Sequence, residues 1–202
     1  MKHLLSALSL ALLSGVASAS AAIGQAAPAF SAQDVHGRSV SLADFKGKHV
    51  ALEWVNPGCP YVRKHYDAKN MQATQQAAQA KGVVWLSVNS THSGHGDYLP
   101  PAKLAAWMQG QGAQATATLM DADGRIGRAY GARTTPHLYL IDPAGRLVYA
   151  GAIDSKPSAN PADIASATNH VNLAIAESLA GKPLSTPATR AYGCTVKYGS
   201  AG

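Results

Sequence analysis

The sequence predicts a mixed α/β domain in which helices flank a central sheet, and three patterns support this prediction. Two apolar runs, His49–Val55 and Val83–Asn89, have the length and composition of buried strands. The helical pattern Pro60–Lys81 lies between them. A later pair of apolar runs is joined by the turn sequence Pro143–Arg146, which is typical of an antiparallel hairpin. This order of elements favours a mixed sheet over a doubly wound one.

The first half of the domain is expected to contain one long helix and several short elements. Residues alternate on both sides of Asp34–Gly37, which predicts a hairpin. Gly82 predicts the end of the long helix, because glycine is a common C-cap. In chain order we expect a hairpin over Ser31–Leu42, a helical turn over Ser41–Phe45, a strand over His49–Val55 and a helix over Pro60–Lys81.

The second half is expected to alternate strands and helices and to close with a helix. The segment Ser90–Pro100 is rich in Gly and His, so we expect an irregular insertion there. Gly181 and Pro183 predict the end of the last helix. The other expected elements are strands over Val83–Asn89, Thr116–Met120, Thr134–Asp142 and Leu147–Ile153, and helices over Pro101–Met108, Arg125–Tyr130 and Pro161–Leu179.

The N-terminus has the pattern of a secretory signal peptide. Lys2 precedes the apolar run Leu4–Val16, and small residues follow, with Ala19 or Ala21 expected as the last residue before cleavage. The apolar run is shorter than the roughly 20 residues of a membrane span, so we expect a periplasmic or secreted protein without a span. The expected division is a signal peptide over 1–21 and a single domain over 22–202, with a cysteine-bearing tail over 185–202.

The chain is basic, with a formal net charge of +6 and a pI near 9.4. A basic protein can bind nucleic acid, but here the Lys and Arg residues are scattered and form no run of five. Together with the expected export, this distribution predicts a solvated surface and no nucleic-acid partner.

Cys59 lies where a buried strand gives way to a helix. Pro57 and Pro60 flank it, so we expect an exposed turn and a helix start at this point. Unpaired N–H groups at a helix start stabilise a thiolate, and Arg63 and Lys64 add positive charge one turn later. The sequence therefore predicts that Cys59 is a reactive thiol rather than an inert buried one.

A second sulfur is missing from the local motif. Val62 occupies the position at which a Cys-x-x-Cys motif has its second cysteine, so the site cannot exchange dithiols by itself. The only other cysteine is Cys194, in the tail. Two cysteines in an oxidising compartment favour pairing. Cys194 could resolve an oxidised Cys59, form a permanent bridge with it, or do neither.

Four segments together resemble one protein family. They are Cys59-Pro60-Tyr61-Val62, Thr134-Thr135-Pro136, Leu147–Asp154 and Gly193-Cys194-Thr195-Val196-Lys197. The chain resembles the thioredoxin-like superfamily, and most closely its peroxiredoxin-like redoxin group of AhpC/TSA type. The resemblance implies a thioredoxin-like fold, a central mixed sheet flanked by helices, here with an N-terminal hairpin extension.

The resemblance also implies roles for three further residues. The Thr135–Pro136 bond is expected to be cis, with its loop against the active sulfur and the Thr135 backbone offered to an extended partner strand. Glu53 precedes Cys59 by six residues, the spacing of a buried proton-transferring acid. The alternative for Glu53 is a strand-end acid that reaches solvent or pairs with a lysine.

The local sequence differs from that of a peroxiredoxin, which has Pro-x-x-x-Thr-x-x-Cys. Leu52 and Asn56 occupy the proline and threonine positions. Asn56 could still donate a hydrogen bond to a peroxide, and Arg63 or Arg133 could stabilise the thiolate. A small peroxide and a protein thiol or disulfide therefore both remain candidate substrates, with an external thiol as reductant.

The insertion contains His92, His95 and Asp97, residue types that bind copper or zinc. Their spacing is not that of a helical pair and glycines separate them, so a solvated loop is the expectation, with no metal or other cofactor. His137 is expected on the surface of its strand.

Two functions follow from these residues. The first is an exported thiol-disulfide oxidoreductase or peroxidase-like redoxin with Cys59 as nucleophile and Cys194 as resolving cysteine. The alternative is a non-catalytic redoxin-fold module with a structural Cys59–Cys194 bridge. Such a module would bind a protein through the Thr135–Pro136 loop, or copper through His92 and His95.

Overall fold

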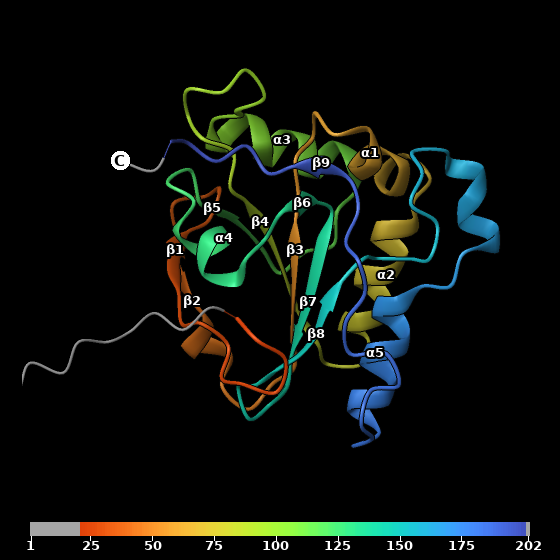
Figure 1. The fold of residues 1–202 in the computed structure, drawn as a ribbon. Coiled ribbons are helices and arrows are strands. Elements are labelled where there is room, and N and C mark those ends of the chain that lie inside the picture. The colour runs from red at the N-terminus through yellow and green to blue at the C-terminus, as the bar shows by residue number, and fades with distance from the viewer. Residues whose placement is uncertain (1–20, 201–202) are drawn as a thin grey trace, which may run out of the picture.

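The computed structural model describes residues 21–200 and has a five-stranded mixed sheet at its centre (Figure 1). The predicted signal peptide, apart from Ala21, lies outside the described residues. In the sheet, β3 pairs in parallel with β4 and β4 with β5, whereas β7 and β8 continue it in antiparallel pairing. The strand order is β5 (Ala117–Met120), β4 (Val84–Asn89), β3 (Val50–Trp54), β7 (His137–Ile141) and β8 (Leu147–Gly151). The predicted mixed sheet is confirmed.

Helices cover one face of the sheet more fully than the other. Ala51 and Val55 point to the face covered by α1, α2 and α5. Leu52 and Trp54 point to the opposite face, where α4 and the N-terminal segment complete a second core. This alternation is the period of two that a strand imposes on its side chains. The helices are α1 (Pro60–Asp67), α2 (Asn70–Gln79), α3 (Pro101–Gln111), α4 (Arg125–Tyr130) and α5 (His170–Leu179).

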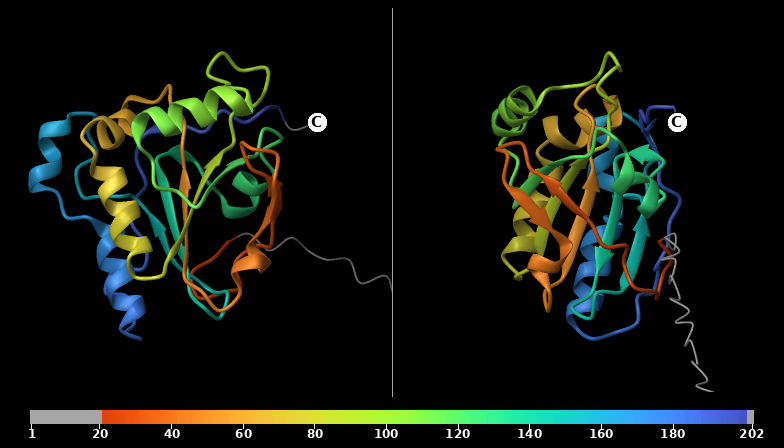
Figure 2. Two further views of the ribbon diagram at one scale, coloured as in Figure 1. Left: turned by 180° about the vertical axis from the view of Figure 1, so that it is seen from behind. Right: turned by 90° about the vertical axis from the view of Figure 1, so that its left-hand side faces the viewer.

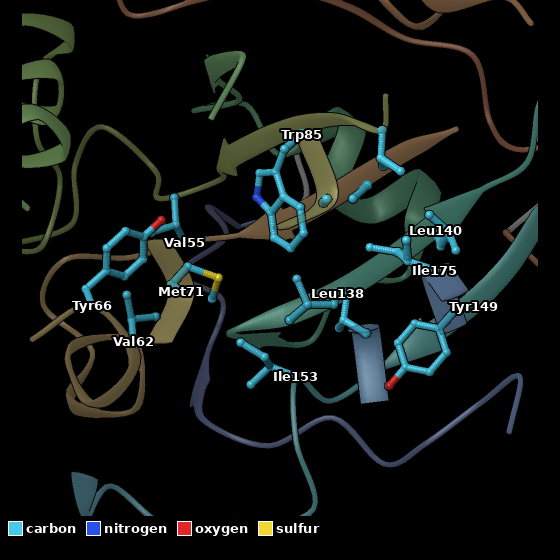
Figure 3. Packing of buried hydrophobic residues seen from close by; sticks show 14 of the residues in the cluster. Val55, Val62, Tyr66, Met71, Trp85, Leu138, Leu140, Tyr149, Ile153 and Ile175 are labelled. Carbon is cyan, nitrogen blue, oxygen red and sulfur yellow. The ribbon is translucent and has the colours of Figure 1, made fainter. Parts of the chain in front are cut away.

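The core under α1 and α2 contains large side chains that are fully buried. Figure 3 shows Val62 and Tyr66 from α1 beside Met71 from α2, with Trp85 of β4 further along the sheet. Tyr66 and Trp85 bury both apolar rings and polar atoms, so each requires a hydrogen-bond partner inside the core. The Glu53 carboxylate accepts hydrogen bonds from both residues.

The N-terminal hairpin extension is also present. β1 (Ser31–Gln33) and β2 (Ser39–Ser41) pair antiparallel, and Asp34 accepts hydrogen bonds from the backbone N–H groups of His36 and Arg38 in the turn. A 3-10 helix, η1 (Leu42–Phe45), follows, capped by Ser41. These predicted elements are confirmed.

The long helix predicted over Pro60–Lys81 is two helices. The break is at Lys69, whose φ of 62° is left-handed and rarely adopted by a non-glycine residue. The Gln72 side chain donates to the Tyr66 carbonyl at 2.9 Å and satisfies an acceptor near the break. No Gly or Pro marks this position, which is why the sequence pattern did not reveal the break.

Two other predicted elements are divided. The last helix is a 3-10 turn, η2 (Pro161–Ser166), followed by α5, whose N-cap Asn169 accepts from the Asn172 N–H at 2.9 Å. The strand predicted over Thr134–Asp142 is β6 (Thr134–Thr135) and β7, because Pro136 between them lacks an N–H.

The tail returns along the sheet and ends over the site. After α5 it contacts the outer strand β8, where the Ala150 N–H donates to the Pro187 carbonyl of the tail and the Ala150 carbonyl accepts from the Thr189 N–H, both at 3.1 Å. It then forms β9 (Cys194–Thr195), an element that the sequence did not predict, which pairs antiparallel with β6. Figures 1 and 2 show the blue tail passing over the end of the sheet near α1 and α3.

Candidate active site

Cys59 is the N-cap of α1 and follows β3 through a tight turn. Asn56 builds this turn, because its side-chain oxygen accepts from the Gly58 N–H at 2.8 Å and its backbone oxygen accepts from the Cys59 N–H at 3.0 Å. Pro60 at the first helical position has no N–H to satisfy and its φ suits a helix. The sulfur of Cys59 is therefore held at the N-terminal end of α1, as the sequence predicted.

Cys59 forms a disulfide with Cys194, and the two Cα atoms are 5.9 Å apart. This Cα separation is typical of protein disulfides. Both cysteines of the sequence are therefore paired, across 135 residues of chain. The structure selects pairing over two free thiols.

The expected exposure of Cys59 is wrong in this disulfide state. Gly58 and Pro60 on either side are exposed, but Cys59 is only 1% exposed. The sequence pattern described the turn correctly and could not show that the distant tail covers it. Cys194 is half-buried, so it is the more accessible residue of the pair.

The Thr135–Pro136 peptide bond is cis, as the resemblance implied. The Thr135 carbonyl oxygen lies 3.1 Å from the Cys59 sulfur. A disulfide sulfur carries no hydrogen, so this is a packing contact here and becomes a possible hydrogen bond only when Cys59 is a thiol. Cys194 is paired opposite Thr135 in the β6–β9 ladder, so the tail occupies the edge expected to receive a partner strand.

Glu53 of β3 is fully buried, and no lysine among residues 21–200 forms an ion pair with it. One carboxylate oxygen accepts from the Tyr66 hydroxyl at 2.8 Å. The other accepts from Gln75 at 3.0 Å, Trp85 at 2.9 Å and Ser87 at 3.1 Å. Burial raises the pKa of the Glu53 carboxyl, while these donors oppose the rise.

These contacts confirm that Glu53 is a buried acid and exclude the solvent-reaching and lysine-paired alternatives. Its donors come from α1, α2 and β4, and Tyr66, near the C-terminal end of α1, connects Glu53 to the helix whose N-cap is Cys59. We call Glu53 with Tyr66, Gln75, Trp85 and Ser87 the Glu53 cluster.

A second buried acid, Asp154, lies at the end of the motif Leu147–Asp154 and anchors the tail. The Tyr192 hydroxyl donates to Asp154 Oδ1 at 2.5 Å. Lys64 Nζ is 3.6 Å from Asp154 Oδ2, and both side chains are buried. Because Tyr192 is two residues before Cys194, this contact holds the tail close to the disulfide. We call Asp154 with Lys64, His65 and Tyr192 the Asp154 cluster.

The positive charge that faces Asp154 comes from Lys64 rather than from His65. His65 Nε2 lies 3.1 Å from the Tyr192 hydroxyl and 3.9 Å from Asp154. Burial lowers the pKa of His65 to about 4, and the Lys64 charge adds to this effect while Asp154 opposes it. His65 is therefore neutral at pH 7. The expectation that Lys64 stabilises the Cys59 thiolate is not met in this structure, because the Lys64 ammonium group faces Asp154 and donates to the Lys156 carbonyl at 2.9 Å.

The residues considered for peroxide chemistry are engaged elsewhere. The Asn56 amide donates to Asp97 at 3.2 Å, and Leu52 is buried in β3. Arg63 donates to the Pro57 carbonyl at 2.9 Å and is exposed, as is Arg133. In the disulfide state, Asn56 and Arg63 therefore hold the turn, and Arg133 faces solvent.

The insertion histidines lie on the surface, as expected. His92 and His95 each accept a backbone N–H through Nδ1, from Gly94 and Asp97 respectively. Within residues 21–200, no group of three or more His, Cys, Asp or Glu side chains is arranged to hold a metal ion. His137 corrects another expectation, because it is buried and stacks on Tyr139 with ring centroids 4.5 Å apart. Burial lowers its pKa to about 4.

Comparison with known proteins gives a family and a fold. The model of the AhpC/TSA family matches residues 23–150. The thiol-disulfide oxidoreductase ResA of Bacillus subtilis is 25% identical over 132 residues, which cover 62% of this chain and 64% of that protein. The alignment thus spans less than two thirds of ResA.

Solved structures extend the similarity to the whole fold. A hypothetical protein from Sinorhizobium meliloti is 24% identical with a TM-score of 0.75, covering 91% of this chain and 98% of that one. The thioredoxin domain of a thiol-disulfide oxidoreductase from Bacteroides vulgatus is 29% identical with a TM-score of 0.51, covering 65% of this chain and 89% of that one. The fold is therefore thioredoxin-like.

No helix in residues 21–200 has the length and apolar character needed to cross a membrane.

Proposed function

We propose that this chain, which belongs to the AhpC/TSA family, is an exported thiol-disulfide oxidoreductase with Cys59 as nucleophile and Cys194 as resolving cysteine. The observation that carries the proposal is the Cys59–Cys194 disulfide at the start of α1, beside the cis Thr135–Pro136 bond. The similarity to thiol-disulfide oxidoreductases from B. subtilis and B. vulgatus supports the reaction class. We propose protein disulfides or thiols as substrates.

The reaction moves two electrons between the cysteine pair and a substrate disulfide. The Cys59 thiolate attacks one substrate sulfur, forms a mixed disulfide and releases the other substrate sulfur as a thiolate. The Cys194 thiolate then attacks the Cys59 sulfur and expels the second substrate thiolate. This leaves the Cys59–Cys194 disulfide, and an external dithiol reduces it by the same exchange chemistry.

The geometry favours entry of the reductant at Cys194. The Cys194 residue is half-buried, whereas Cys59 is 1% exposed, so we expect an incoming thiolate to attack at Cys194. Cys59 then leaves as a thiolate at the N-terminal end of α1, where the helix dipole and free N–H groups stabilise negative charge. A low-pKa thiol leaves faster than an ordinary one.

Glu53 is proposed as the acid that exchanges protons with the site during these steps. Its raised pKa suits that role, and the Tyr66 hydroxyl links it to α1. Thr135 and Pro136 are proposed as the docking loop, because their backbone lies against the Cys59 sulfur.

A peroxide is the second candidate substrate, on the ground of family membership. In that reaction the Cys59 thiolate attacks a peroxide oxygen and becomes a sulfenic acid, while the other oxygen leaves as hydroxide or alkoxide. Cys194 then condenses with the sulfenic acid and releases water. We favour disulfide exchange, because the Asn56 side chain, the donor considered for a peroxide, is already engaged. Its amide group donates to Asp97, and its oxygen accepts from the Gly58 N–H in the turn.

Export is proposed from the basic, apolar and small-residue pattern of residues 2–22. An oxidising compartment outside the cytoplasm is also where a disulfide persists. The proposed location is the periplasm or the cell exterior.

A redox titration of the full mature protein tests the proposal. We expect the Cys59–Cys194 disulfide to open at a potential above about −300 mV, the range of labile and catalytic disulfides. Turnover of a model protein disulfide should be abolished in Cys59→Ser, while Cys194→Ser should accumulate the mixed disulfide. Hydrogen peroxide consumption, followed in parallel, distinguishes the two substrates.

The opposite outcome supports the non-catalytic alternative. If the disulfide stays closed well below −300 mV and Cys59→Ser only lowers the melting temperature, the bridge is structural. The burial of Cys59 under the tail favours this non-catalytic alternative, because a structural disulfide is expected to be shielded from reductants.

A further inference from the structure

The tail is attached to the domain as an added strand. In the β6–β9 ladder, Thr135 lies opposite Cys194 and Thr134 opposite Thr195. The Val196 N–H then donates to the Arg133 carbonyl at 3.0 Å. Addition of an extended segment to a strand edge is a general way for proteins to bind peptides.

The residue immediately before Cys194 must be small, because the backbone of the tail lies very close to the backbone of β6 at this point. Gly193 has a φ of 131°, a conformation that side-chain-bearing residues avoid. A Cβ atom at this position would collide with the Thr135 carbonyl. A strand in this register therefore needs glycine immediately before its cysteine.

Two residues after the cysteine, a socket receives an aliphatic side chain. Val196 is 6% exposed and joins the core cluster that contains Trp54, Ile126 and Tyr130. Burial of a valine side chain stabilises the bound strand relative to exposure of the same side chain.

Four residues after the cysteine, a slot receives a tyrosine. Gly124 and Gly127 form its wall, because a Cβ atom at either position would overlap the Tyr198 side chain. The Tyr198 hydroxyl donates to the Ala132 carbonyl at 2.8 Å, and the Arg128 guanidinium lies 4.6 Å from the ring centroid. The slot therefore recognises both the ring and the hydroxyl group.

We infer that this surface, the β6 edge with the Val196 socket and the Tyr198 slot, is the substrate-docking groove, and that the tail is its intramolecular occupant. The partner is an extended protein segment with the tail's own pattern, Gly-Cys-x-aliphatic-x-Tyr. This inference rests on the proposed function and specifies the substrate class of the same site.

The groove also orders the reaction. Reduction of Cys59–Cys194 by an external dithiol frees the tail, and the partner strand takes its register. The Cys59 thiolate attacks the partner's disulfide at the docked cysteine, and the partner's other cysteine leaves as a thiolate. When the tail returns, Cys194 attacks the Cys59 sulfur, expels the docked cysteine as a thiolate and displaces the product strand from the groove.

The test measures how fast Cys59 reacts with peptides in the full-length variant Cys194→Ser, Val196→Ser and Tyr198→Ser, whose tail no longer fills the socket and the slot. One peptide has the sequence Ala-Tyr-Gly-Cys-Thr-Val-Lys-Tyr-Gly, with its cysteine activated by thionitrobenzoate, whose release is followed by absorbance. The control peptide has serine in place of the valine and the second tyrosine. We expect the second-order rate constant to be at least tenfold larger for the first peptide.

A protein variant tests the slot itself. Gly127→Ala fills it and should reduce the preference between the two peptides to less than twofold. Gly110→Ala is the matched control, because it also replaces a helical glycine but meets no atom within 4 Å. It should retain the preference. Melting temperatures of both variants establish that they fold.

The outcomes separate this inference from the proposed function. Equal rates for the two peptides, with normal reaction of Cys59 toward a small disulfide, overturn the docking groove and leave the function intact. No reaction with any disulfide overturns the function. If reoxidised wild-type protein is instead a dimer linked through Cys59–Cys194 bonds between copies, the occupant is a second copy's tail and the inference is wrong.

Discussion

Two of the buried acids of this molecule, Glu53 and Asp154, lie in clusters of opposite character. Glu53 accepts hydrogen bonds from neutral donors of the core, in α1, α2 and β4. Asp154 lies beside the ammonium group of Lys64 and accepts from Tyr192 of the tail. The first cluster connects α1, α2 and β4 and contains no residue of the tail, whereas the second connects the domain to the segment that bears Cys194.

The difference shows how one small domain can separate stability from switching. The Glu53 cluster is closed to solvent, so its free energy contributes to folding whether the disulfide is open or closed. The Asp154 cluster contributes fully only while the tail is in place. Loss of a contact in it should therefore change the balance between the oxidised and reduced states.

The largest expected effect comes from removal of the acceptor in the Glu53 cluster. Glu53→Leu leaves buried donors such as Trp85 Nε1 and Gln75 Nε2 without their acceptor. At about 1–3 kcal/mol for each unsatisfied group, and with some re-pairing, the free energy of unfolding should fall by about 3–5 kcal/mol. Urea unfolding of the oxidised and reduced proteins measures it.

The comparison requires this loss to be equal in both redox states. Glu53→Gln is the control, because it keeps an acceptor oxygen in place and should lose less. A loss that differs by more than about 1 kcal/mol between the states would show that the Glu53 cluster also depends on the tail.

The next effect is a pH dependence located in the Asp154 cluster. The folded-state pKa of His65 is about 4, below its ordinary value of 6.5. As pH falls below 6.5, the unfolded chain takes up a proton that the folded protein does not, so stability decreases until pH reaches about 4. Between pH 7 and pH 4.5 this loss is about 2 kcal/mol.

The variant His65→Gln isolates that contribution. The difference in free energy of unfolding between wild type and His65→Gln should change by about 2 kcal/mol over the same range. His137 also has a lowered pKa, so part of the pH dependence must remain in this variant. An unchanged difference from pH 7 to pH 4.5 would contradict the assignment of a neutral buried His65.

The smallest effect is expected from the hydroxyl that joins the tail to Asp154. Tyr192→Phe removes that donor and keeps the ring, so the oxidised protein should lose about 1 kcal/mol. The reduced protein, whose tail is free to leave, should lose less. The disulfide should then be easier to reduce, with a potential about 20 mV less negative in a glutathione titration.

A neighbouring tyrosine provides the control for this measurement. Tyr61 packs edge-on against Tyr192 with ring centroids 5.9 Å apart, so Tyr61→Phe keeps the packing and leaves the hydroxyl of Tyr192 in place. It should not move the potential. A more negative potential in Tyr192→Phe would show that the Asp154 cluster favours the reduced state instead.

Much of the fold and part of the site could be predicted from local sequence. The buried strands, the β7–β8 hairpin and the helix start at Cys59 each depend on apolar runs, turn residues or prolines that lie next to one another. The break at Lys69 could not be predicted, because a left-handed residue there is supported by side chains such as Gln72 rather than by a glycine. The roles expected of Glu53, Thr135 and Pro136 came from family resemblance and stay predictions, whereas the structure shows that the Thr135 carbonyl contacts the Cys59 sulfur and that Glu53 is buried against Tyr66.

The sequence by itself determined where the thiol lies and that its neighbour Val62 cannot be its redox partner, because these are properties of adjacent residues. Only the tertiary structure decided that Cys194 pairs with Cys59 across 135 residues of chain and that the tail covers Cys59. It also decided that the Lys64 ammonium group lies beside the Asp154 carboxylate. The physical reason is that such contacts depend on loop closure and burial over long separations, and local patterns carry no information about which distant surface a tail will cover.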